Sequence, residues 1–127
     1  MEYIQTTLAE VRPQRDAMLA WIYEERREYG RTRGLESYRL VAAFVDALEC
    51  VVARDCKGAR RAFARWELFA ERLLDKQLFD DSHNTVAVSM STGETRRGVD
   101  GCTFTLGEMV REHRAILVDA MDMCADA

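Results

Sequence analysis

Residues 36–55 read ESYRLVAAFVDALECVVARD, and two apolar stripes run through them at helical spacing. The first stripe is Tyr38, Val41, Val45, Leu48 and Val52, and the second is Leu40, Phe44, Ala47 and Val51. Because residues three and four apart share one face of an α-helix, the stripes predict a helix that is apolar around most of its circumference. A helix of this kind belongs in the middle of a bundle. We therefore predict that 36–55 is the central element of the core.

The segment before this helix is also expected to be helical, but in two pieces. Apolar residues recur at helical spacing over 3–29, and Pro13 interrupts them. Proline lacks an amide donor and clashes with the preceding turn. We therefore predict a short lead helix that ends near Arg12 and a main helix with Pro13 in its first turn. Gly30 is expected to end the main helix.

A third helix is expected over 59–78, after a short turn at 55–58 that makes the second and third helices an antiparallel hairpin. The residues expected on its buried face are Ala62, Phe63, Trp66, Phe69, Ala70 and Leu73. Trp66 should be among the most buried side chains of the protein.

The composition changes over 80–101, which is rich in Ser, Thr, Gly and Asp. Residues 85–90 and 102–106 alternate apolar and polar side chains, as half-buried strands do. This region is expected to be a long polar connection or a small β-hairpin. The last helix should begin after Thr105, which with Glu108 forms a capping box.

These elements predict a mainly all-α fold: a four-helix bundle with a short N-terminal lead helix and room for a small β-hairpin before the last helix. The 127 residues fit a single helical domain, 1–127. The net charge of −4 is modest, so no field of the whole molecule draws it to nucleic acid or to an anionic membrane.

Cysteine usage favours a reducing compartment. Cys50, Cys56, Cys102 and Cys124 form no closely spaced pair, the first residues are not a secretory signal, and no apolar run approaches a membrane span. We expect four free thiols and a cytoplasmic protein, in its own cell or in a host, with no membrane association. No cofactor or metal site is predicted, because phosphate-binding and zinc-binding spacings are missing.

The charges of the third helix form an unusual pattern. Arg61, Arg65, Arg72 and Lys76 fall on one outward arc, and acidic residues fall on the arc beside it. Its charged pairs at spacing i,i+4 are of like sign, which costs each pair a few tenths of a kcal/mol. Opposite charges on neighbouring helices, a binding partner or simple solvation would each explain the pattern. Arg96 and Arg97, between glycines in the polar region, are a second candidate contact.

The predicted function is a non-enzymatic protein-interaction module, an adaptor, inhibitor or regulator. It would present a charged helix face (Arg61, Arg65, Arg72 and Lys76) and a long loop (Arg96 and Arg97) to another protein. One alternative is a nucleic-acid-associated regulatory protein that uses the basic stripe, although the negative net charge disfavours it. Another alternative is a small enzyme or metal-binding protein that uses His113 on the inward face of the last helix or the Asp80–His83 cluster, in which Asp80, Asp81 and His83 could hold a divalent cation.

Self-association is also predicted. Small bundles often pair through apolar surface that their own core leaves uncovered, and a two-fold homodimer is the commonest result. Tyr3, Ile4 and Leu8 are the expected contacts, since a lead helix kinked at Pro13 would pack least completely.

Overall fold

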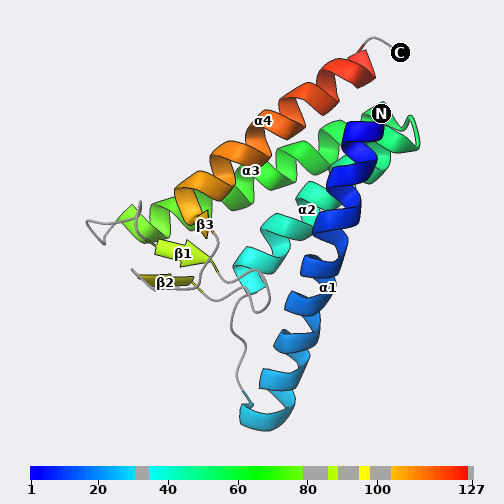
Figure 1. Ribbon diagram of the computed structural model, residues 1–127. Coiled ribbons are helices and arrows are strands. Elements are labelled where there is room, and N and C mark those ends of the chain that lie inside the picture. The colour runs from blue at the N-terminus through cyan, green and yellow to red at the C-terminus, as the bar shows by residue number, and fades with distance from the viewer. Residues whose placement is uncertain (31–34, 79–85, 89–94, 98–103, 126–127) are drawn as a thin grey trace.

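The computed structural model describes the backbone of residues 1–30, 35–78, 86–88, 95–97 and 104–125, and the side chains of residues 1–30, 35–74 and 107–125. Four helices form a bundle in these residues (Figure 1): α1 (Glu2–Tyr29), α2 (Leu35–Val52), α3 (Cys56–Leu78) and α4 (Leu106–Ala125). The predicted all-α class and helical bundle are therefore confirmed.

The central position of α2 is confirmed as well. This helix contacts each of the other three helices, while α3 and α4 also contact each other. The residues of α2 with no exposed surface come from both apolar stripes: Leu40, Val41, Phe44, Val45, Ala47 and Leu48. Because apolar surface is removed from water on both sides of it, α2 holds the bundle together.

The predicted break at Pro13 is wrong, because α1 is one continuous helix with Pro13 inside it. Ala9 and Pro13 both lie on the exposed side of α1. The carbonyl that loses its amide partner is therefore close to water. Buried residues on both sides of the proline, Leu8, Val11 and Met18, join the same core. Their burial outweighs the cost of one proline, so no separate lead helix exists.

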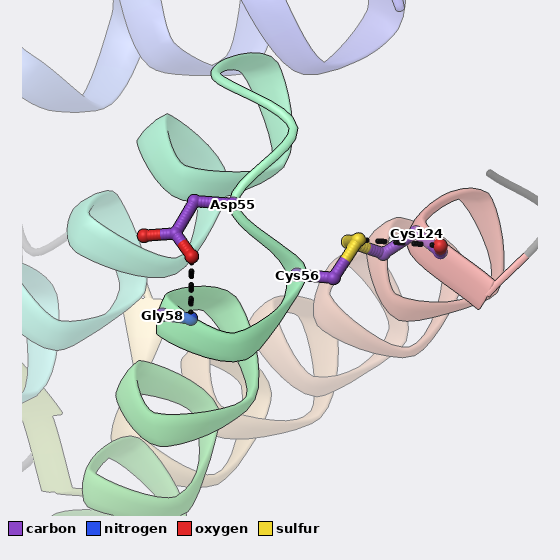
Figure 2. The surroundings of a disulfide bond; sticks show 4 residues. All are labelled: Asp55, Cys56, Gly58 and Cys124. Atoms are coloured by element: carbon purple, nitrogen blue, oxygen red, sulfur yellow. Dashed lines mark hydrogen bonds between the residues drawn. A yellow bond between two sulfur atoms is a disulfide. The ribbon is translucent and has the colours of Figure 1, made fainter.

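The end of α1 and the turn from α2 to α3 both follow from local chemistry. Gly30 ends α1 as predicted: its φ of 64° is left-handed, and its amide donates to the carbonyl of Arg26 at 3.0 Å. The turn from α2 to α3 lies earlier than predicted, at 53–55, where the amides of Arg54 and Asp55 bond back to carbonyls at the end of α2. Asp55 Oδ1 then accepts from the amide of Gly58 at 2.9 Å and caps α3 (Figure 2).

Three short strands precede α4: β1 (Val86–Val88), β2 (Thr95–Arg97) and β3 (Phe104–Thr105), in the order β2-β1-β3. Both pairings are antiparallel, and β1 and β3 contact α4. This differs from the two-stranded hairpin of the prediction, and the segments that join the strands lie outside the described residues. The bundle of four helices is therefore the main architecture of the described residues.

The expectation of four free thiols is wrong for two of them. Cys56, the first residue of α3, forms a disulfide with Cys124 in the last turn of α4, with the two Cα atoms 5.5 Å apart (Figure 2). Cys50 is free, and Cys102 lies outside the described residues. The argument for a reducing compartment therefore loses its main support. No helix in the described part of the chain is long and apolar enough to cross a membrane.

Two of the three residues predicted to form a dimer contact belong to the core instead. Ile4 and Leu8 are buried, and only Tyr3 is exposed. The reason is the continuity of α1 through Pro13, which lets the first turns of this helix pack fully on α2. Self-association therefore stays a prediction, but Ile4 and Leu8 cannot supply its contact surface.

Candidate functional site

The candidate site is the solvent-facing side of α3, where exposed residues share one arc of the helix. We call this arc the outer face of α3, and it consists of Lys57, Arg61, Ala64, Arg65, Leu68 and Arg72. The opposite side of α3 packs into the core through Ala59, Ala62, Trp66, Ala70 and Leu73. Because that side is anchored along several turns, the outer face is presented as a rigid surface.

The arginines of the outer face differ in how they are paired. Arg65 Nη2 lies 3.5 Å from Asp46 Oδ2 on α2, so a neighbouring helix compensates this charge. Arg61 and Arg72 form no ion pair with any described residue. Compensation by neighbouring helices, one of the explanations that the sequence left open, therefore applies to Arg65 and not to the other two. Within the part of the chain whose side chains the structure describes, the predicted basic stripe is thus only partly neutralised.

Leu68 is the apolar member of the outer face. It is 47% exposed and lies one turn from both Arg65 and Arg72. A single exposed leucine is ordinary on a protein surface. Here it stands in line with Arg61 and Arg72, so the face combines an aliphatic side chain with cations above and below it. The sequence reasoning followed only the charges and missed Leu68, although its helical position would have placed it among them.

A hollow of about 500 Å³ adjoins the outer face where α2 ends and α3 begins. Its lining residues are Asp46, Glu49, Cys50, Ala53, Asp55, Gly58, Arg61 and Arg65. Most of these charges are already engaged. Glu49 Oε1 accepts from Arg12 Nε at 2.9 Å and also lies 3.9 Å from Arg15 Nη1, and Asp55 caps α3. The remaining cation is Arg61, which borders both the hollow and the outer face.

Cys50 in this hollow is half-buried and free. Its pKa is raised, first by burial and then by the carboxylates of Asp55 and Asp46. A raised pKa keeps the sulfur as a neutral thiol, which is a weak nucleophile. The hollow is therefore not arranged to activate this cysteine.

His113, the residue of the enzyme alternative, lies in the core. It is 8% exposed, and its ring stacks on Phe44 with 4.0 Å between the ring centroids and 9° between the planes. Its Nδ1 has no hydrogen-bond partner among the described residues. Helical spacing in the last helix predicts an inward His113, and the structure confirms this position and packs the ring against an aromatic ring. A catalytic pair of His113 with Cys102 would be one form of the enzyme alternative, but Cys102 lies outside the described residues.

The burial of His113 predicts a loss of stability in acid. Burial lowers the pKa of His113 from 6.5 to about 4, because the charged imidazole is poorly solvated there. The unfolded chain therefore takes up this proton first, and stability is complete above pH 6.5 and declines as the pH falls toward 4. Between pH 7 and pH 5, we expect this histidine to lower the free energy of unfolding by roughly 2 kcal/mol.

Urea denaturation at pH 7 and pH 5 measures this loss. The matched control is His113→Phe, which keeps an aromatic ring on Phe44 and cannot titrate. Carboxylates titrate in both proteins, so the difference between the two pH profiles isolates His113. Identical profiles would contradict the assignment.

Several predicted residues are only partly placed. Lys76 lies in α3 and Arg96 and Arg97 lie in β2, but their side chains are outside the described part of the structure. Because β2 pairs with β1, Arg96 and Arg97 belong to a strand and not to the tip of a loop. The 80–83 cluster lies outside the described residues altogether. In the described residues, no group of three His, Cys, Asp or Glu side chains could hold a metal ion.

Comparison of this chain with protein-family models, with curated proteins and with solved structures finds no match.

Proposed function

We propose that this protein is a non-enzymatic interaction module that binds an acidic protein surface through the outer face of α3. The observation that carries the proposal is the alignment of exposed Leu68 with Arg61 and Arg72, neither of which has an ionic partner among the described residues. An acidic partner would supply the missing counter-charges, and an apolar side chain on the partner would cover Leu68.

The energetics of the helix support this assignment. At spacing i,i+4, Arg61 and Arg65 repel each other, as do Glu67 and Glu71. Alternating signs would have stabilised α3 by the same few tenths of a kcal/mol per pair. A segregated arrangement is costly for folding and useful for recognition, because it gives one arc a single sign of charge.

The nucleic-acid alternative has less support from the same face. Proteins that bind single strands place aromatic side chains for base stacking within the basic surface. Here Trp66 is buried, Phe63 and Phe69 are half-buried, and the centre of the arc is aliphatic. The enzyme alternative gains no support at His113, which packs inside the bundle.

Charge reversal of the outer face tests the proposal. Arg61→Glu with Arg72→Glu should reduce capture of the partner protein from native lysate by tenfold or more, measured by quantitative mass spectrometry after affinity purification. The melting temperature should change little, because exposed sites usually shift stability by less than about 0.5 kcal/mol.

The matched control is Arg39→Glu with Arg111→Glu, which changes the net charge equally at exposed positions on α2 and α4. This control should retain full capture. Equal losses of capture in the two double variants would mean that only net charge matters. That result would contradict binding through a specific face of the protein. Capture that disappears after nuclease treatment would favour the nucleic-acid alternative.

Arg96 and Arg97 stay a second, separate proposal for partner contact. Replacing both with alanine should leave the fold intact and weaken capture if β2 takes part. Full capture by this variant would confine the contact to α3.

A further inference from the structure

The disulfide between Cys56 and Cys124 joins two helix ends that are 68 positions apart in sequence. Cys56 begins α3, while Cys124 is the last residue but one of α4. The bond therefore fastens the end of α4 to the start of α3 (Figure 2). The bond lies at the margin of the fold, where helix ends fray and open locally. A bond at this position can therefore control local opening when it is broken.

Little else holds the last turn of α4 in place. That turn has no basic residue, and Asp122 puts a negative charge beside the negative end of the helix dipole. Besides Cys124 itself, which is buried in the core, its apolar contacts come from Met121 and Met123, which are only partly buried against the core. The turn before it is better anchored, because Leu117 and Ala120 are fully buried.

We propose that the Cys56–Cys124 disulfide is a reversible clip, which a dithiol reductant opens to release the last turn of α4 from α3. Release would uncover the apolar side of Met121 and Met123 while the bundle stays folded. The clip thus couples the redox state of the surroundings to the exposure of an apolar surface at one end of the molecule.

The chemistry balances as a two-step thiol–disulfide exchange. A thiolate of the reductant attacks the sulfur of Cys56, which is half-buried, whereas Cys124 is only 7% exposed. Cys124 leaves as a thiolate and takes up a proton. The second thiol of the reductant then attacks the mixed disulfide, and Cys56 leaves. Two electrons and two protons pass to the protein, and the reductant becomes a disulfide.

The local structure favours the second step. Cys56 departs at the N-terminus of α3, where the helix dipole stabilises a thiolate. The carbonyl oxygen of Cys124 lies 3.3 Å from Cys56 Sγ, so once reduced, the thiol of Cys56 has an acceptor (Figure 2). Such a thiol hydrogen bond is far weaker than the covalent link, so the reduced turn opens and closes.

Amide hydrogen exchange with mass spectrometry on the full chain tests the clip, with dithiothreitol as the dithiol. After reduction, the amides of 121–125 should exchange at least tenfold faster than before, and far faster than those of 40–48 in α2, which exchange only when the whole fold opens. Removal of dithiothreitol and reoxidation with oxidised glutathione should restore the slow exchange.

Two variants complete the test. Cys56→Ser should show fast exchange at 121–125 without any reductant, and Cys50→Ser, which changes the free cysteine, should behave as the unmodified chain does. Unchanged exchange after reduction would overturn the proposal, because the turn would then be held without the disulfide. Exchange of 121–125 at the same rate as 40–48 after reduction would also overturn it, since the turn would then open only together with the whole fold.

Discussion

Replacement of Trp66 by alanine should lower the free energy of unfolding by about 3–5 kcal/mol, the usual cost of deleting a buried large aromatic side chain. Trp66 has no exposed surface and meets Phe63 edge-on, with 6.2 Å between the ring centroids. The guanidinium of Arg114 lies 5.3 Å from the centroid of the Trp66 ring and adds a cation–π contact between α4 and α3. Truncation would therefore leave a cavity at a junction of two helices and remove a link between them.

Urea denaturation monitored by circular dichroism measures this loss, and Trp66→Phe is the matched control. Trp66 Nε1 has no hydrogen-bond acceptor among the described residues, so phenylalanine gives up no such bond. It should cost clearly less than alanine. A loss below about 1 kcal/mol for Trp66→Ala would contradict the orientation of α3, because a buried indole cannot be deleted so cheaply.

Loss of the Cys56–Cys124 disulfide should lower the free energy of unfolding by roughly 4 kcal/mol. The bond closes a loop with a sequence separation of 68, and a link across a long loop removes much entropy from the unfolded chain. The clip proposal concerns local opening of the folded chain, whereas this effect arises mainly in the unfolded state. Because core amides exchange through global unfolding, this loss also speeds exchange at 40–48, and the clip is measured by how much faster 121–125 exchange than 40–48.

Denaturation curves with and without reductant measure this difference, with Cys56→Ser as the variant that lacks the bond. The unfolded chain should also titrate two fewer thiols without reductant than with it. Equal thiol counts would show that the bond does not form in solution. Equal stabilities in spite of a formed bond would mean that strain or residual structure offsets the entropy gain.

The candidate site could be predicted in part from the sequence. Helical periodicity placed Arg61, Arg65 and Arg72 on one arc, and the structure keeps them there. It could not show that Arg65 is paired with Asp46, because that contact depends on how α2 and α3 pack. The same limit applied to Cys50, whose hollow exists only where the two helices meet.

The sequence by itself determined the elements and their inward faces. The two apolar stripes of α2, the left-handed stop at Gly30 and the burial of Trp66 all depend on interactions within a few residues or on the spacing of apolar side chains. Patterns of this range are written directly in the chain, since neighbours at three and four positions share a helix face.

Only the tertiary structure decided the rest. Pro13 reads locally as a break, yet burial of Leu8 and Met18 on either side of it keeps α1 continuous. Cys56 and Cys124 read as separate thiols until the packing of α4 on α3 brings their Cα atoms to 5.5 Å. His113 lies on the inward face that its helix predicts, but only the packing of α4 against α2 stacks it on Phe44. In each case the deciding contact joins residues far apart in sequence, and its free energy depends on helix packing that no local pattern encodes.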